Sequence, residues 1–258
     1  MTESGPESTA PERKYHIQCS AGDVGEFVLL PGDPGRCDAI AKRFESPRRV
    51  AQNREYTTFT GTLGGVKVSV TSTGIGGPSA AIAMEELASL GAKTFIRVGT
   101  CGALSRKLKP GDLVIADSAV RNDGTSRQYL PVEFPAVATL TVLNALLSAA
   151  GRSHVQTYVG TVVSNDAFYR EGELTLPGRE TIWEQGNVLA AEMEAATLFT
   201  VARVRRLSVG AICMVSNTVA GDMPPPSSLL LEKLLDTAVD ALGLLTASTR
   251  GRELSATS

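Results

Sequence analysis

The chain has 258 residues, of which 43% are hydrophobic and 20% are charged, and its formal net charge is −2. This composition is ordinary for a globular protein and excludes a mostly disordered chain. The near-neutral charge excludes the strongly basic surface of a general nucleic-acid-binding protein. We therefore expect a globular protein with no nucleic-acid partner.

Short β-type runs alternate with longer helical patterns along the chain. The predicted strands, in chain order, lie at 26–30, 57–62, 66–71, 94–98, 113–116, 157–163 and 208–215. The predicted helices lie at 36–44, 79–90, 134–150, 190–204 and 227–246. The strands at 57–62 and 66–71 are joined by Gly64-Gly65, which predicts a hairpin. The alternation as a whole indicates an α/β fold with a largely parallel or mixed sheet.

The domain organisation follows from what lies between these elements. Residues 14–246 contain no linker, charge block or repeat, so we expect a single domain there. Residues 1–13 and 247–258 are rich in small and polar residues, and we expect both to be disordered tails.

The four cysteines are widely spaced, form no CxxC pair and are accompanied by only two histidines. This pattern disfavours both a zinc site and a disulfide framework, and it favours a reducing, cytoplasmic location. The N-terminus has no apolar signal segment, and no run is apolar enough to predict a membrane span. We therefore expect no metal and no membrane partner.

Several predicted strands end in segments rich in glycine, serine, threonine and asparagine. These are PGDPGR (31–36), STGIGGPS (72–79), RVGTCGAL (97–104), VVSNDAF (162–168) and MVSNTVAGD (214–222). In α/β folds ligands bind where strands end, and glycine lets backbone N–H groups approach an anion. Each segment alone is equally well read as a tight turn, and none matches a Walker A loop or a GxGxxG motif. Together they predict one shared pocket.

Arg97 lies inside an otherwise apolar predicted strand. An unpaired buried charge is costly, so Arg97 either forms a salt bridge with a carboxylate or binds an anion with its planar guanidinium. Arg36, after the first glycine-rich turn, and Arg54 are further anion-binding candidates. Two carboxylates, Glu192 and Glu194, stand at the start of a predicted helix, where acidic residues favour the helix dipole. The functional alternative is that one of them holds paired sugar hydroxyls.

A run of motifs in this chain resembles the nucleoside phosphorylase superfamily, and within it the uridine phosphorylase branch. The motifs are, in order, PGDPGR, REYTTFTG, STGIGGPSAAIAMEEL, RVGTCGAL, GDLVIADSAVRNDG, PVEFPAVA and AAEMEAATLF. The resemblance covers residues 14–245. It implies a three-layer αβα sandwich around a mixed, partly barrel-like sheet.

The resemblance also implies an activity, reversible phosphorolysis of a ribonucleoside by phosphate to free base and ribose 1-phosphate. The implied substrate is uridine or a related or modified pyrimidine nucleoside, and no metal or organic cofactor is required. The branch is usually hexameric, and its site needs at least a dimer. A monovalent cation lies at the dimer interface of some relatives, at the positions matched by Glu55 and Ser79.

The resemblance assigns roles to individual residues. It implies that Arg97, Glu194 and Asn217 take part in catalysis. The implied phosphate site consists of Gly32, Arg36, Arg97, Thr100 and, from a neighbouring subunit, Arg54. The implied ribose site consists of Met193, Glu194 and, across the same interface, His16. The implied base site consists of Cys101, Gly102, Phe168, Glu192 and Asn217.

The base side departs from the pattern of the uridine branch. That branch reads uracil with a glutamine and an arginine, and Gly172 and Leu174 stand at those positions here. Either Arg170, Arg179 or Gln185 replaces them from a re-routed loop, or the base is different. Asn217 stands where purine phosphorylases have an acid; as an amide it can hydrogen-bond a base edge but cannot donate a proton as an acid. A turn residue after a strand is the equally plausible interpretation of Asn217.

Three alternatives stay open. A purine nucleoside phosphorylase would cleave inosine faster than uridine. A phosphate-independent nucleosidase would have no need for the arginine set described above. A catalytically silent nucleoside-binding protein would bind a ligand without turnover in phosphate.

Overall fold

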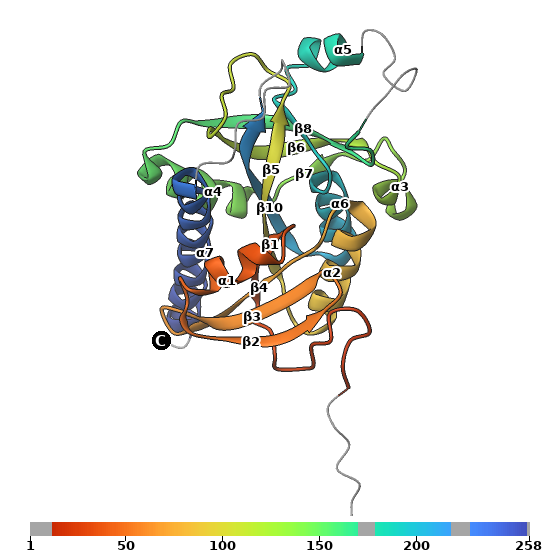
Figure 1. Cartoon of the computed structure of the whole chain (residues 1–258). Helices are drawn as coiled ribbons and strands as arrows, with labels where there is room; N and C mark the ends of the chain where they lie inside the picture. Colours follow the sequence, from red (N-terminus) through yellow and green to blue (C-terminus); the bar gives the residue numbers. More distant parts are fainter. Residues whose placement is uncertain (1–11, 170–178, 218–227, 257–258) are drawn as a thin grey trace, which may run out of the picture.

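The computed structural model describes residues 12–169, 179–217 and 228–256, which form one mixed sheet with helices on both faces (Figure 1). The strands are β1 (Phe27–Pro31), β2 (Glu45–Asn53), β3 (Tyr56–Leu63), β4 (Val66–Thr71), β5 (Thr94–Ala103), β6 (Leu113–Asn122), β7 (Ala136–Val137), β8 (Thr157–Asn165), β9 (Ala190–Glu192) and β10 (Ser208–Asn217). The helices are α1 (Gly35–Ala41), α2 (Gly77–Ser89), α3 (Thr125–Tyr129), α4 (Leu140–Ser153), α5 (Arg179–Gln185), α6 (Ala195–Arg205) and α7 (Ser228–Ala256).

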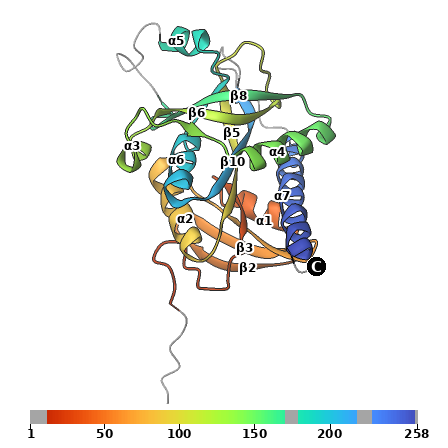
Figure 2. The ribbon, with the colours of Figure 1, turned by 180° about the vertical axis from the view of Figure 1, so that it is seen from behind.

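The sheet closes on itself at one end. Its strand order is β10-β6-β8-β9-β5-β1-β4-β3-β2, and β10 also pairs with β5. The strands β5, β10, β6, β8 and β9 therefore form a closed ring, while β1 to β4 continue from it as an open sheet. Helices α4 and α7 lie on one side of the sheet and α2 and α6 on the other, as both views show (Figures 1 and 2). The predicted three-layer, partly barrel-like fold is confirmed.

The side chains of the central strands alternate between two separate hydrophobic clusters, one on each face of the sheet. On β1, Val28 and Leu30 join the cluster packed against α2 and α6, whereas Phe27 and Leu29 join the cluster packed against α1, α4 and α7. Successive side chains of a strand point to opposite faces, so an apolar run such as FVLLP buries both faces at once. The short apolar runs of the sequence therefore form the strands of the sheet, which is the middle layer of the fold.

The predicted hairpin is confirmed, because β3 and β4 pair antiparallel through Gly64-Gly65. Both glycines have positive φ, at 57° and 79°, which this tight turn requires. The strand β2 was not predicted. It lies at the edge of the sheet, carries mostly exposed side chains and has no apolar alternation to mark it.

Two predicted helices begin later than expected. The helix expected from residue 134 starts at Leu140, because Ala136–Val137 forms β7 and pairs with β6. The helix expected from residue 190 starts at Ala195, because Ala190–Glu192 forms β9 and pairs with both β5 and β8. Local helix propensity is outweighed in both places by pairing with strands distant in sequence.

The last helix, α7, continues beyond its predicted end at residue 246 and through most of the segment expected to be a C-terminal tail. Residues 1–11 of the expected N-terminal tail lie outside the described residues. Within the described part of the chain, no helix is both long and apolar enough to cross a membrane.

Candidate active site

Arg97 occupies the middle of β5, between Leu30 of β1 and Ala211 of β10, and only 5% of the residue is exposed. Its Nη2 lies 2.5 Å from Oε2 of Glu194, and its Nη1 donates to Oγ1 of Thr73 over 3.0 Å. Among the described residues, Nε of Arg97 is a buried side-chain atom with no hydrogen-bond partner. The salt-bridge interpretation of Arg97 is thus confirmed.

Glu194 is the N-cap residue of α6 and is 3% exposed. Its Oε1 accepts a hydrogen bond from the backbone N–H of Gly76 over 2.7 Å, while Oε2 contacts Arg97. Gly76 has a φ of 92°, so it adopts a left-handed conformation at the start of α2 that favours glycine. One carboxylate therefore joins the start of α6, the turn before α2 and the central strand β5.

The loop after β1 approaches Arg97 closely. A Cβ added to Gly32 would lie 3.2 Å from Nη2 of Arg97 and 3.2 Å from the carbonyl oxygen of Gly74. The carbonyl of Gly32 in turn accepts a hydrogen bond from Gly74 N–H over 3.0 Å. A side chain at position 32 would crowd the guanidinium, so this glycine brings the backbone of the first loop beside the charge.

A second guanidinium belongs to the same centre. Arg36 of α1 is mostly buried, and its Nε lies 4.0 Å from Oδ2 of Asp33. Burial lowers the pKa of Arg36; Asp33 opposes this effect, and the positive charge of Arg97 adds to it. Two guanidinium groups that influence each other in a poorly solvated place form a site that an anion would stabilise.

Glu192, the last residue of β9, is buried, and both of its carboxylate oxygens contact protein donors. Oε2 accepts the backbone N–H groups of Glu194 and Ala195, each over 2.8 Å, and Oε1 accepts the hydroxyl of Ser164. Burial and the nearby charge of Glu194 raise the pKa of Glu192 to about 7, although Ser164, the Glu194 N–H and Arg97 lower it. Glu192, on β9, therefore caps the start of the helix α6.

The ends of β5 and β10 lie side by side. A Cβ added to Gly102 would lie 3.0 Å from Oδ1 of Asn217, and the hydroxyl of Ser216 donates to the carbonyl of Cys101 over 3.1 Å. Cys101 is buried, and a hydrogen bond with Cys213 together with burial raises its pKa. Thr100 is half-buried on the same strand. The structure therefore groups Thr100, Cys101, Gly102 and Asn217 at one strand end.

The remaining expected ribose and base residues of this subunit are less enclosed. Met193 is half-buried directly before Glu194, whereas Phe168 is 66% exposed and contacts Tyr169 edge-to-face, with ring centroids 5.0 Å apart. Gln185, at the end of α5, is exposed. The positions Arg170, Gly172 and Leu174 lie outside the described residues, as does the side chain of Arg179.

The residues expected to act across a subunit interface make no hydrogen bond with this centre among the described residues. Arg54 is exposed in the turn between β2 and β3, and Nδ1 of His16 lies 2.7 Å from Oε1 of Glu86. Within the described residues, no hydrogen bond joins Arg54 or His16 to Arg97 or Glu194. Next to Arg54, the expected cation ligands do contact each other, because Ser79 donates to Glu55 over 2.8 Å. A backbone hydrogen bond, together with the one from Ser79, lowers the pKa of Glu55.

Sequence reasoning missed the individual roles of Thr73, Gly76 and Ser164. All three stand in the segments singled out at the ends of β4 and β8, so their place in a segment rich in glycine and polar residues was the available signal. Which of these polar residues touches a charge could not be decided, because their partners are distant in sequence.

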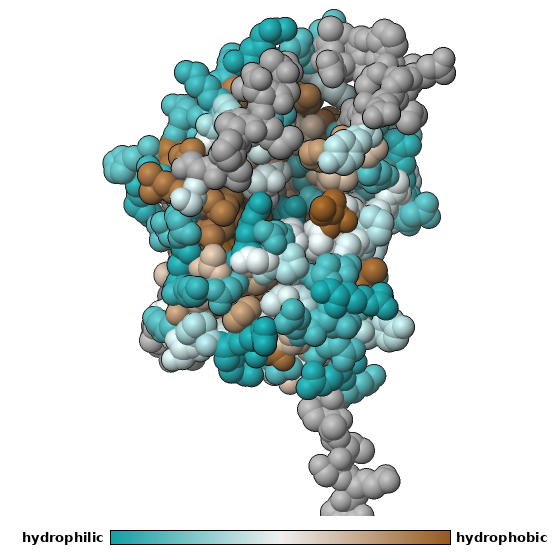
Figure 3. All heavy atoms as spheres, in the orientation of Figure 1, coloured by the Kyte–Doolittle hydropathy of each residue, from teal (hydrophilic) through white to brown (hydrophobic). Residues whose placement is uncertain are grey.

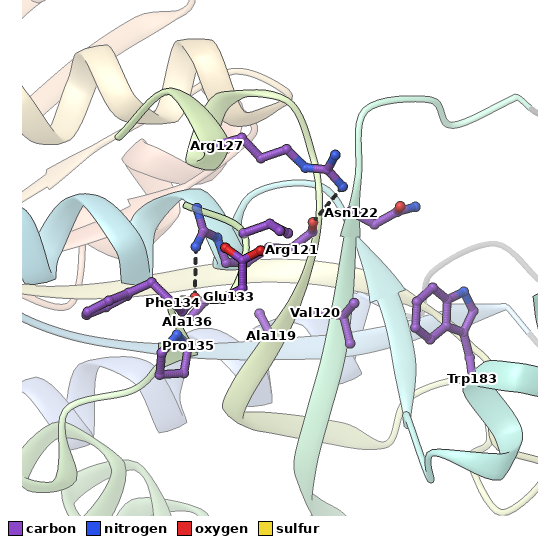
Figure 4. A pocket seen from close by; sticks show the side chains of 11 residues that line it. Ala119, Val120, Arg121, Asn122, Arg127, Glu133, Phe134, Pro135, Ala136 and Trp183 are labelled. Atoms are coloured by element: carbon purple, nitrogen blue, oxygen red, sulfur yellow. Dashed lines mark hydrogen bonds between the residues drawn. The ribbon is translucent and has the colours of Figure 1, made fainter. Parts of the chain in front are cut away.

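A separate cavity opens beside β6, α3 and α5, with Arg121 at its side (Figure 4). Its lining includes none of the expected site residues. The guanidinium of Arg121 donates to backbone carbonyls of Ser126, Leu130, Pro131 and Phe134. Arg121 thereby holds the PVEFPAVA segment against β6, which gives these matched motifs a structural role.

Comparison with known proteins gives consistent results. A family model described as "Phosphorylase superfamily" matches residues 26–248. A uridine phosphorylase of Thermococcus kodakarensis is 49% identical over 211 residues, which cover 78% of this chain and 76% of the relative. A uridine phosphorylase of Treponema pallidum is 48% identical, covering 78% and 81%. A guanosine phosphorylase of Halorubrum lacusprofundi is 46% identical, covering 81% and 86%.

Proposed function

The chain belongs to the phosphorylase superfamily, and on that premise we propose that it is a nucleoside phosphorylase acting on uridine or a related pyrimidine ribonucleoside. In this reaction the C1′–N bond of the nucleoside breaks and a bond forms between C1′ and an oxygen of inorganic phosphate. The base leaves with the electron pair of the broken bond and takes up a proton. The products are free base and ribose 1-phosphate.

The buried guanidinium of Arg97 is the observation that carries this proposal. It lies beside the Gly32 loop and near Arg36, and its Nε is free of hydrogen bonds within the described residues. Phosphate is a weak nucleophile, so two guanidinium groups that hold it beneath C1′ supply orientation. The phosphate charge also stabilises the cationic character that develops on the sugar as the base departs.

Glu194 is the proposed ribose ligand. Its carboxylate oxygens contact Gly76 N–H and the guanidinium of Arg97, so they lie at the centre of the site. A 2′ or 3′ hydroxyl would donate to the same oxygens, and Met193 would pack against the sugar. Binding energy from the hydroxyls, which do not react, can then be used to distort the sugar towards its transition state.

The base side supports a second candidate, a guanosine-type purine phosphorylase. One relative carries that name, and the side-chain amide of Asn217 lies beside Gly102, with its Oδ1 accepting the hydroxyl of Ser216 over 3.2 Å. An amide can hydrogen-bond either a pyrimidine or a purine edge, and it gives no proton to the leaving base. In the pyrimidine reaction, Phe168 would stack near the base and Cys101 would line its pocket.

We also propose that the protein works as a homo-oligomer, of at least two subunits and of the hexameric type. Arg54 is exposed, and the nearby Ile75 is 77% exposed. Exposed hydrophobic side chains form several separate groups on the face shown in Figure 3. A second subunit packed on the β2–β3 turn would cover Ile75 and receive Arg54 and His16 in its own site.

We propose that the reaction needs no metal or organic cofactor and that phosphate is a co-substrate. A monovalent cation at Glu55 and Ser79 would sit in the proposed interface, and the four free cysteines fit a cytoplasmic location.

The proposal is tested by base release from uridine, thymidine, inosine and guanosine, each with and without phosphate, read by chromatography. We expect phosphate-dependent release, fastest from uridine. Faster release from guanosine would establish the second candidate. Release without phosphate would establish a nucleosidase, and binding without release would establish a silent nucleoside-binding protein.

A further inference from the structure

Glu192 and Ser164 together cap the helix that carries Glu194. The first N–H groups of a helix have no partner within it, and buried ones must find another acceptor. Here the N–H groups of Glu194 and Ala195 donate to Glu192, and the N–H of Ala196 donates to Ser164 Oγ over 2.8 Å. Ser164 and Glu192 also pair in register across β8 and β9. The cap is therefore anchored on both strands.

The cap determines where Glu194 can be. Glu194 is the residue at which the chain passes from β9 into α6, and its own N–H is held by Glu192. If the Glu192 carboxylate were removed, the backbone N–H of Glu194 would lose its acceptor, which is Oε2 of Glu192. The carboxylate of Glu194 would then no longer be held at 2.5 Å from Arg97 and 2.7 Å from Gly76.

We propose that Glu192 is a positioning residue, which holds the backbone of Glu194 so that the Glu194 carboxylate meets the ribose hydroxyls, and that it does not contact the base. This inference rests on the proposed phosphorylase function. It replaces the base-contact role expected for Glu192, because hydrogen bonds from Ser164, Glu194 and Ala195 already engage both carboxylate oxygens.

The charged surroundings of Glu192 agree with a role within the protein. Glu194 repels it from α6, Arg97 attracts it from β5, and the thiol of Cys101 on β5 lies close enough to sense its charge. The charge of Arg97 therefore acts on both buried carboxylates, although the ion pair that it forms among the described residues is with Glu194. A phosphate bound to Arg97 would add negative charge beside both carboxylates. The surroundings of Glu192 therefore do not support a role in which it contacts the base.

Three variants of the full chain test the proposal. Glu192→Gln keeps an acceptor for the two N–H groups, whereas Glu192→Ala removes it. Asp123→Asn is the matched control: Asp123 is a buried carboxylate that caps α3 through Ser126 N–H and accepts the hydroxyl of Thr197 on α6. Within the described residues, no hydrogen bond joins Asp123 to Arg97 or Glu194.

The activity measurement compares kcat/KM for uridine and for 2′,3′-dideoxyuridine at saturating phosphate. We expect Glu192→Ala to lower the value for uridine about tenfold or more, and to lower the value for the dideoxy substrate much less. Glu192→Gln should keep most of the wild-type preference for uridine. Asp123→Asn should change both substrates by the same factor. An equal loss on both substrates in Glu192→Ala would overturn the proposal.

A changed ratio of uracil to guanine release, with the hydroxyl preference intact, would also overturn it, because Glu192 would then read the base. If the wild-type protein releases no base from any nucleoside, the proposed function fails, and hydrogen exchange decides the cap. Faster amide exchange over residues 193–198 in Glu192→Ala than in Glu192→Gln would support the cap. Equal exchange in the two variants would refute it.

Discussion

The Arg97–Glu194 centre and the base end of the site, at Asn217 and Phe168, are built differently. Arg97 and Glu194 are 5% and 3% exposed, and they are contacted by the loops that follow β1 and β4 and by the residue that precedes α2. Asn217 is half-buried at a strand end, and Phe168 is 66% exposed. The proposed ribosyl-phosphate chemistry is thus part of the core, whereas the choice of base is made at the edge.

The difference has an energetic reason. Removing one partner of a buried ion pair leaves an uncompensated charge, which costs about 3–5 kcal/mol of stability. Replacing a half-exposed amide or ring removes a contact worth about 1 kcal/mol, and water can take its place. Substrate range can therefore change at the edge of this fold with little effect on stability, while the centre tolerates very few substitutions.

The largest expected effect follows from removing the guanidinium at the centre. Arg97→Ala should lower kcat/KM at limiting phosphate about a thousandfold, because phosphate loses a preorganised charged donor. The variant should also unfold at a lower temperature, since the buried Glu194 carboxylate loses its ion-pair partner. Arg43→Ala is the matched control, because Arg43 also pairs with carboxylates, but those carboxylates, Glu232 and Asp236, are exposed. Near-wild-type turnover of Arg97→Ala would refute the phosphate assignment.

The second prediction concerns the ribose ligand. Glu194→Ala should lower turnover of uridine roughly a hundredfold, because the sugar hydroxyls lose their acceptor. The loss with 2′,3′-dideoxyuridine should be much smaller, since that substrate has no hydroxyl to bind. Comparing the two substrates in steady-state kinetics checks this. The same fractional loss on both would contradict a hydroxyl-binding role for Glu194.

The third prediction concerns how the stability of the protein depends on pH through the ionisation of Glu192. Its pKa is raised from 4.5 to about 7 in the folded protein, so between these values the folded state binds a proton that the unfolded state lacks. The resulting stabilisation is complete below pH 4.5 and is lost as pH rises through about 7. Thermal melts from pH 5 to 8 should therefore show a steeper decline for the wild type than for Glu192→Gln. Parallel curves would count against the raised pKa.

The smallest expected effect lies at the base end. Asn217→Ala should change the ratio of uracil to guanine release by less than about tenfold, because one hydrogen bond to a base edge is lost. Asn122→Ala is the control, since Asn122 is an amide at the end of β6 that pairs with Asn165 over 2.7 Å. If only the control changes the ratio, Asn217 does not read the base.

Much of the fold was accessible from local patterns in the chain. The alternation of short apolar runs with helical segments predicted an α/β fold with a largely parallel or mixed sheet, and Gly64-Gly65 between two strands predicted the hairpin. The three-layer arrangement was implied by the family resemblance. The failures share one cause. The edge strand β2 has no apolar face to reveal it, and β9 is a three-residue strand whose alanine-rich sequence favours a helix.

The strand β5 shows the same limit at the candidate site. Its prediction ended at Val98 because Gly99 and Gly102 weaken a strand locally. The strand continues to Ala103 because β10 pairs with it along this length and β9 pairs with its last residues. Long-range pairing thus brought Thr100, Cys101 and Gly102 onto a strand facing Asn217.

The amino-acid sequence was sufficient to predict the fold class, the family and the polar residue types at the strand ends, because these depend on local periodicity and on motifs in order. The tertiary structure alone decided that Arg97 pairs with Glu194, a residue 97 positions away, and that Glu192 caps α6 from a neighbouring strand. The reason is physical: a charge in the core is stabilised by whichever groups the folded backbone brings to it, and neighbours in sequence do not reveal those groups.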